Sequence, residues 1–129
     1  MISEKSNIKN YKELLFWKKS FVVTLLIIRL TRKFPKERVF LIVTDQIIRA
    51  ASSVGANIAE GFGRYRGKEY ERFLQISLGS SNEVEYWMLV IKELLPQYQQ
   101  EIATIVEENN QTIRMLASSL KTLRGKREV

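Results

Sequence analysis

The chain of 129 residues contains no cysteine and no histidine. Without cysteine it can form neither disulfides nor thiolate metal sites. Without histidine it lacks the commonest general base and the commonest transition-metal ligand. Proline, with two residues, and glycine, with six, are both scarce, which suits long regular elements better than a loop-rich fold. We therefore expect a non-enzymatic protein with no catalytic residues, no metal site and no cofactor.

Long hydrophobic runs are missing as well. The longest, residues 21–28, is interrupted by Thr24 and followed by Arg29, whereas a membrane-spanning helix needs about 20 apolar residues. Residues 1–10 have no apolar segment of the kind found in a signal peptide. We expect a soluble cytoplasmic protein with one domain over residues 11–123, an N-terminal tail over 1–10 and a C-terminal tail over 124–129.

The net charge of +7 is distributed unevenly along the chain. Residues 1–68 carry 14 Lys and Arg against 5 Asp and Glu, whereas residues 69–129 carry 7 against 9. A one-sided basic field favours a polyanion partner, most simply nucleic acid. The alternative is solubilising charge on an ordinary surface, and composition alone leaves both open.

Four helical segments account for most of the chain. They cover residues 11–34, 37–59, 68–95 and 97–123, and Pro35, Gly61, Pro96 and Gly125 mark their ends. Short connections place consecutive helices side by side in opposite directions. The predicted fold is an all-α, antiparallel up-and-down four-helix bundle.

The first segment carries two apolar arcs at about 100° per residue. One arc contains Leu14, Trp17, Phe21, Leu25 and Ile28, and the other contains Phe16, Val23, Ile27 and Leu30. A helix of a monomeric bundle needs only one such stripe, and large exposed apolar patches usually mark interfaces. We assign the second arc to the interface of a homo-oligomer.

Small residues crowd the second and third segments. If these helices are antiparallel neighbours, residue pairs whose numbers sum to about 130 lie side by side, so Ser52 approaches Gly79 and Ser53 approaches Ser77. Nearby polar residues are assigned structural roles, with a ligand site as the alternative: Asn57 bonding across the bundle, and Glu60 pairing with Arg49 or Arg64. Asn109 falls on the apolar stripe of the last segment. It is either a buried residue that fixes register or a partly exposed one.

Residues 61–68 alternate glycine with aromatic and basic side chains. Such side chains stack on unpaired bases and contact phosphates, so we assign Arg64, Arg66 and Lys68 to phosphate and Tyr65 to stacking. The competing interpretation is a glycine turn between two helices. Further basic residues extend the candidate nucleic-acid surface: Lys12, Lys18, Lys19, Arg32, Lys33 and Arg38.

Several motifs occur in a distinctive order. They are Leu14-x-x-Trp17-x-Lys19, Leu30-Thr31-x-x-Phe34-Pro35, Gln46-Ile47-x-Arg49-Ala50-Ala51-x-Ser53-x-x-Ala56-Asn57-Ile58-Ala59-Glu60-Gly61-x-Gly63-Arg64 and Phe73-Leu74-x-Ile76-x-x-Gly79-Ser80. Over residues 11–95 the chain resembles the four-helix-bundle proteins encoded in intervening sequences of bacterial 23S ribosomal RNA genes.

The resemblance implies an up-and-down bundle that assembles as a homopentamer. It also implies a relation to the accessory protein of diversity-generating retroelements, a similar bundle that binds nucleic acid and a reverse transcriptase. It supplies no catalytic residue. The function expected is ribosomal-RNA-linked nucleic-acid binding, with RNA favoured over DNA. The alternative is a scaffold that docks a partner protein on its apolar stripes.

Overall fold

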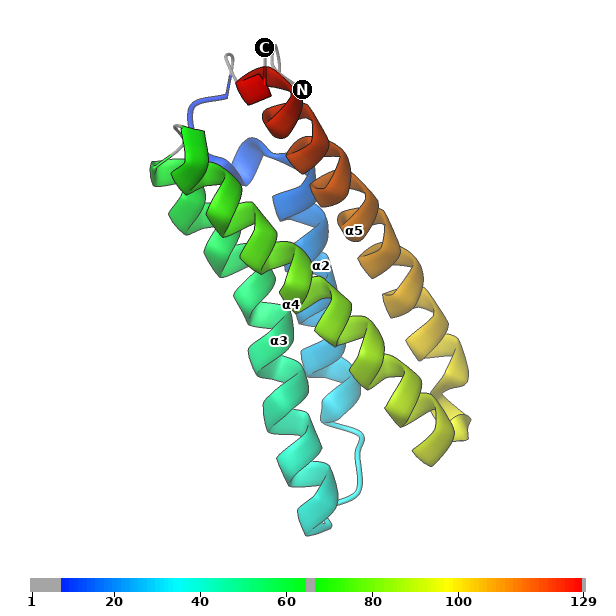
Figure 1. Ribbon diagram of the computed structural model, residues 1–129. Coiled ribbons are helices and arrows are strands. Elements are labelled where there is room, and N and C mark those ends of the chain that lie inside the picture. Colours follow the sequence, from blue (N-terminus) through cyan, green and yellow to red (C-terminus); the bar gives the residue numbers. More distant parts are fainter. Residues whose placement is uncertain (1–7, 65–66, 129) are drawn as a thin grey trace.

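Four long helices lie side by side in alternating directions in the computed structural model, which describes residues 8–64 and 67–128 (Figure 1). Two single-turn 3₁₀-helices accompany them, and the described part of the chain contains no strand. The elements are η1 (Tyr11–Glu13), α2 (Leu15–Thr31), α3 (Arg38–Gly63), α4 (Gly67–Leu94), η2 (Pro96–Tyr98) and α5 (Gln99–Glu128). The predicted all-α four-helix bundle is confirmed.

The first helix begins later than predicted because a separate turn precedes it. The Asn10 side chain accepts a hydrogen bond from the Lys12 backbone N–H at 2.9 Å, and the Asn10 N–H donates to the Glu13 carboxylate at 3.0 Å. This reciprocal capping box stabilises η1. It fixes Tyr11 next to the start of α2, a placement that matters for the groove described below.

The second helix continues past Gly61, which the sequence suggested as its end. Gly61 is buried within α3, and a Cβ placed on it would lie 2.6 Å from the Phe73 Cβ. Glycine is therefore needed there for the close approach of α3 to α4 rather than for a cap. The helix ends at Gly63, and the Arg64 N–H donates to the Gly61 carbonyl. Gly67 then adopts φ of +54°, a conformation that other residues rarely take.

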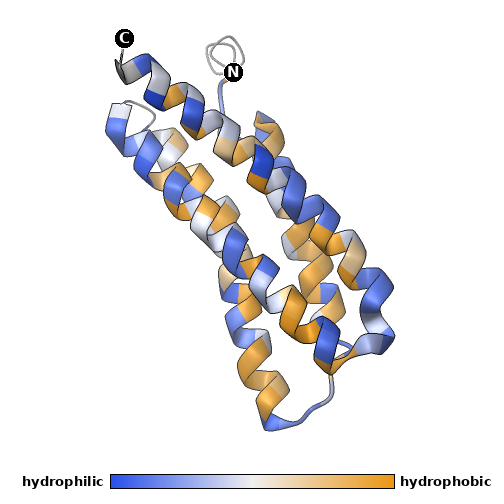
Figure 2. Cartoon of the chain, turned by 45° about the vertical axis from the view of Figure 1, so that its right-hand side comes forward, coloured by the Kyte–Doolittle hydropathy of each residue, from blue (hydrophilic) through white to orange (hydrophobic). Residues whose placement is uncertain are grey.

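Helix α4 ends where proline predicts, but helix α5 does not end where glycine predicts. Helix α4 stops at Leu94, and Pro96 opens η2. Helix α5 passes Gly125 and continues to Glu128, beyond the predicted end at Leu123. Figure 2 shows α5 as the mostly hydrophilic helix, in contrast to the strongly hydrophobic first turns of α3 at the bottom of the view.

The core consists of two hydrophobic clusters with polar residues between them. One cluster, toward the α2–α3 turn, includes Ile27, Ile47 and Ile91, and the other, toward η1, includes Ile58 and Leu74. The buried polar residues between the clusters are Ser20, Ser77, Ser81, Asn109 and Thr112. Bonds from this layer cross between helices, which fixes their register.

The arc assigned to an oligomer interface is instead the buried side of α2. Phe16, Val23, Ile27 and Leu30 are at most 4% exposed and pack against other helices of the same chain, so that assignment is wrong. In the other arc Phe21 is 49% exposed, whereas Leu14 is buried. Periodicity found both arcs, but the burial of one of them depends on where α3 and α5 approach α2.

Candidate nucleic-acid interface

The outer side of α2 carries cations at its ends and apolar residues between them. Steps of three and four place Lys18, Val22, Leu25, Arg29 and Arg32 on one strip, which we call the α2 face. The three cations are exposed and form no ion pair with another described residue. At about 1.5 Å rise per residue the strip extends roughly 21 Å, long enough to follow several phosphates of a nucleic-acid strand.

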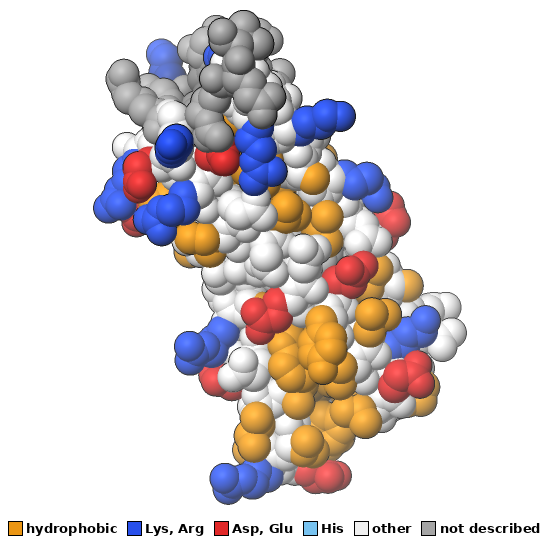
Figure 3. Space-filling model, in the orientation of Figure 1, with side chains coloured by type: hydrophobic (Ala, Val, Ile, Leu, Met, Phe, Trp, Pro, Cys, Tyr) orange, Lys and Arg blue, Asp and Glu red, His pale blue; other side chains and the backbone are white. Residues whose placement is uncertain are grey.

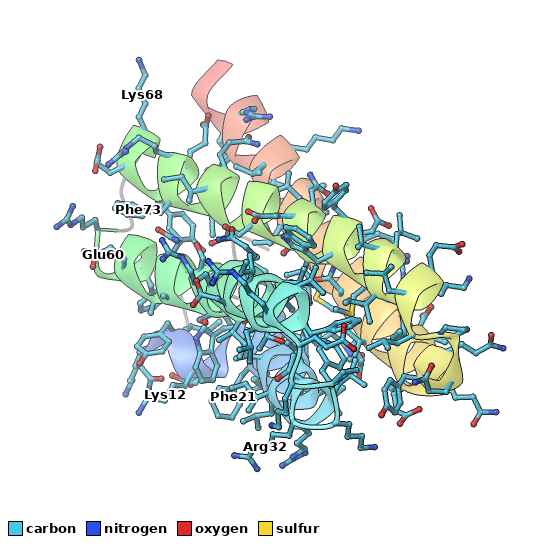
Figure 4. The ribbon with its side chains drawn as sticks, turned by 90° about the horizontal axis from the view of Figure 1, so that it is seen from below. Lys12, Phe21, Arg32, Glu60, Lys68 and Phe73 are labelled. Carbon is cyan, nitrogen blue, oxygen red and sulfur yellow. The ribbon has the colours of Figure 1, made fainter. Side chains whose placement is uncertain are left out.

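Two further predicted cations, Lys12 and Arg38, are exposed near the two ends of α2. Figure 4 shows Lys12, Phe21 and Arg32 on the same side of the bundle, whereas Lys68 projects from the opposite side. The predicted basic residues are thus divided. Lys12, Lys18, Arg32 and Arg38 belong with α2, and Lys68 does not.

Three other predicted nucleic-acid residues, Lys19, Lys33 and Arg64, are engaged in ion pairs. Lys19 Nζ lies 3.1 Å from a Glu108 carboxylate oxygen. Lys33 Nζ lies 3.0 Å from Glu101 and 6.0 Å from the centroid of the Tyr98 ring. The Lys19 and Lys33 pairs tie α2 to α5, so these two lysines are less available to phosphate than the cations of the α2 face.

Arg64 also lies within a local cluster. It pairs with Glu60 at 3.2 Å, as predicted, and its guanidinium carbon lies 5.6 Å from the Phe73 ring centroid. Tyr65 and Arg66 lie outside the residues that the structure describes. Lys68 is exposed and, with Arg72 and Arg124, lines a separate pocket of about 410 Å³ between α4 and α5.

The salt bridge at Glu101 perturbs that carboxyl group. The hydrogen bond from the Lys33 ammonium lowers the pKa of Glu101, with a smaller contribution from backbone hydrogen bonding. The ionised form is therefore favoured in the folded protein. This pair helps to keep the end of α2 against the start of α5.

The polar residues assigned structural roles behave differently from one another. Asn109 is 2% exposed, and its Nδ2 donates to the Ser81 carbonyl across the α4–α5 contact at 2.9 Å. Asn57 bonds to Ser53 on its own helix, and the Ser53 hydroxyl lies 2.9 Å from that of Ser80. Asn57 thus reaches α4 only through Ser53. Arg49 is exposed and does not pair with Glu60.

The small residues pack differently from the prediction. The α3–α4 register is close to that expected, because Ser77 Oγ donates to the Val54 carbonyl at 2.9 Å. However, Gly79 faces open space, and a Cβ on Gly55 would meet Ser20 and Trp17 of α2. The predicted approach of Ser52 to Gly79 is therefore wrong. Small residues of α3 thus face both neighbours: Gly55 lies against α2, whereas Ser53 lies against Ser80 of α4.

A groove of about 250 Å³ lies along this contact between α2 and α3. We call it the aromatic groove. Its aromatic wall and its floor of small residues are formed by Tyr11, Trp17, Phe21, Ser52, Gly55 and Ala56. Residue types alone gave no sign of it, because the groove depends on Tyr11 being placed by η1 and on the small residues facing α2. Arg29, which was not assigned to the binding residues, lies on the α2 face.

Exposed apolar side chains gather elsewhere. On the face shown in Figure 3, hydrophobic side chains concentrate over the lower half, where the first turns of α3 and the second half of α4 lie. We call the exposed large residues of these two segments the apolar patch: Val39, Leu41, Ile42, Tyr86, Leu89 and Leu94. Helix α3 is long and apolar enough to cross a membrane by those two measures alone, yet Ile47 and Ile58 on it are completely buried within the bundle.

The fold and this surface define a small antiparallel helical bundle with one basic outer side and a separate apolar patch. The chain belongs to the 23S rRNA-intervening sequence protein family, whose sequence pattern matches residues 12–118. The resemblance found in the sequence is thereby confirmed.

A solved structure supports the fold independently. The chain is similar to a Bacteroides thetaiotaomicron protein of unknown function from the S23 ribosomal protein family, with a TM-score of 0.76 and 24% identity. The similarity covers 83% of this chain and 99% of that one. No curated protein matches the chain significantly.

Proposed function

We propose that this protein binds RNA without catalysis, using the α2 face as its main phosphate contact. The observation that carries the proposal is the row of exposed cations Lys18, Arg29 and Arg32, which no acidic side chain of the described chain neutralises. Phosphate contacts of this kind supply most of the affinity of non-specific nucleic-acid binding. The family name, which refers to 23S ribosomal RNA, supports RNA over DNA.

The charge of the whole molecule supports the same side. Residues 8–64, which include α2 and α3, contain 11 Lys and Arg against 4 Asp and Glu, whereas residues 67–128 contain 8 against 9. A polyanion is therefore attracted toward the α2–α3 side of the bundle.

A charge-removal experiment tests this proposal. The variant K18Q/R29Q/R32Q is compared with K92Q/R114Q/K121Q, which removes three exposed cations from α4 and α5. We expect the first variant to weaken binding of a fluorescently labelled single-stranded RNA by about tenfold or more. The second should bind nearly as the wild type does. Equal losses in both variants would contradict a specific role for the α2 face.

We also propose that the protein self-associates through the apolar patch, now that the arc first assigned to the interface is known to lie in the core. Leu41 and Leu89 are 58% and 56% exposed, and a concentration of exposed large apolar residues marks association sites. Self-association would bring several α2 faces into one assembly. A partner protein on the same patch is the alternative, and sedimentation of the purified chain distinguishes the two.

A further inference from the structure

The aromatic groove has the features of a stacking site. The Trp17 and Phe21 rings lie nearly parallel, with centroids 5.2 Å apart and an interplanar angle of 20°. The Tyr11 and Trp17 rings meet edge to face, with centroids 5.2 Å apart. All three rings are at least partly exposed. They form an aromatic wall over η1 and the first two turns of α2, with solvent on its open side.

The floor of the groove is formed by residues with small side chains or none. Ser52, Gly55 and Ala56 of α3 lie opposite the rings. A Cβ on Gly55 would lie only 3.4 Å from Trp17 Nε1, so glycine lets the indole pack closely against α3. The Trp17 N–H forms no hydrogen bond with another residue of the described chain. It is thus an unused donor beside an apolar slot.

The volume and the charges favour a small planar ligand attached to an anion. Pockets for drug-sized ligands typically measure about 300–1,000 Å³, so a groove of about 250 Å³ suits one planar ring system. The exposed Lys12 and Lys18 directly follow Tyr11 and Trp17 in the sequence. The nearby acids are engaged: Glu13 in the capping box and Glu60 with Arg64.

We infer that the aromatic groove holds one unstacked base of a single-stranded RNA whose phosphates lie along the α2 face. This inference rests on the proposed function and narrows its substrate class from nucleic acid in general to unpaired RNA. Bases within a duplex are stacked and cannot enter such a groove, whereas bases of single strands stack on aromatic side chains. The Trp17 N–H offers the inserted base one hydrogen-bond donor.

The test uses the full chain, a labelled single-stranded RNA and the same RNA annealed to its complement. Phe21→Ala removes part of the aromatic wall, and Ala56→Leu fills the slot from the other side. Both positions are exposed, so the core is left intact. Ile76→Ala is the matched control, since Ile76 is an exposed apolar residue of α4 outside the groove, the α2 face and the apolar patch.

We expect F21A and A56L to weaken single-strand binding by about 5- to 150-fold, the range of one stacked base, and to leave duplex binding unchanged. I76A should match the wild type. In a W87F background, where Trp17 is the remaining tryptophan, saturating single-stranded RNA should quench the fluorescence and duplex should not.

Three results would overturn the inference. If F21A and A56L bind single strands as I76A does, while K18Q/R29Q/R32Q still binds weakly, the groove is not a base site and the proposed RNA-binding function stands. If the wild type binds neither form of RNA, both ideas fail. If F21A and A56L change the sedimentation coefficient and weaken single-strand and duplex binding equally, the groove is covered by a second copy instead.

Discussion

At the scale of single residues, Asn109 shows why a polar side chain sits on an apolar stripe. The sequence left its burial open, and the structure places it in the polar layer, bonded to the Ser81 carbonyl of the neighbouring helix. A shift of α5 by one residue would break this bond and bury an unsatisfied amide. Asn109 therefore favours the observed register of α5 over registers shifted by one residue.

Asn109→Ala should lower the free energy of unfolding by about 1–3 kcal/mol, because it removes the cross-helix bond and leaves a void in the core. Asn82→Ala, at an exposed position of α4, should change it by about 0.5 kcal/mol or less. Urea denaturation of the two variants measures the difference. Equal stabilities would mean that the Asn109 bond does not contribute to the fold.

Gly61 and Gly63 form a natural pair for testing close packing. A Cβ on Gly61 would lie 2.6 Å from the Phe73 Cβ, whereas one on Gly63 would meet nothing within 4 Å. Gly61→Ala should therefore destabilise the protein by about 1–3 kcal/mol through overpacking. Gly63→Ala should be neutral or stabilise by up to about 1 kcal/mol. Thermal melts of both variants check this, and a destabilised Gly63→Ala with a stable Gly61→Ala would reverse the account.

At the scale of elements, the sequence predicted which helices form and in what order better than which side of each helix faces its neighbours. Proline and short connections located four helices and their antiparallel order, because those signals act locally. The expectation that facing residues of α3 and α4 have numbers summing to about 130 also came close to the observed register, in which Ser77 bonds to the Val54 carbonyl. These features depend on residues near one another in the chain or on simple geometry.

The faces of α2 and the position of Gly61 could not be predicted in the same way. Both arcs of α2 are apolar, so the periodicity alone does not say which arc meets α3 and α5. Gly61 is typical of a helix end in sequence, yet Phe73 of another helix requires it. The candidate site shared this limit: the exposed cations were predictable, but the pairing of Lys19 and Lys33 with acids on α5 depends on tertiary contacts.

The Lys33–Glu101 pair gives a prediction about pH at the α2–α5 contact. Because folding lowers the pKa of Glu101, the pair stabilises the fold above the ordinary carboxyl pKa range, and this contribution is lost as the pH falls through the folded pKa. The difference in melting temperature between the wild type and Glu101→Gln should therefore be present at neutral pH and vanish in acid. Since the pair is exposed, the difference should be small. A difference that grows in acid would contradict the assigned sign.

At the scale of the whole molecule, basic and apolar surfaces occupy different regions of one small bundle. The α2 face carries three exposed cations that form no ion pair with another described residue, and the apolar patch lies on α3 and α4. A protein with this division can associate through one region while the other remains open to RNA. The proposed self-association makes this division useful, because copies of the chain then present several basic faces together.

The wild-type chain should sediment well above its monomer mass of 15.1 kDa at micromolar concentration. Leu41→Glu, which places a charge in the apolar patch, should shift it toward the monomer. Ile76→Glu, at a 39% exposed position of α4 outside the patch, should not. A wild type that sediments as a monomer would rule out the self-association proposal and favour a partner protein on the patch.

The salt dependence of RNA binding tests the central claim most directly. We predict that log Kd of the wild type for single-stranded RNA rises steeply with log salt concentration. The slope of K18Q/R29Q/R32Q should be smaller by about 2, at roughly 0.7 for each lost phosphate contact. A wild-type slope near zero, or the same slope in both proteins, would show that the α2 face does not hold phosphates.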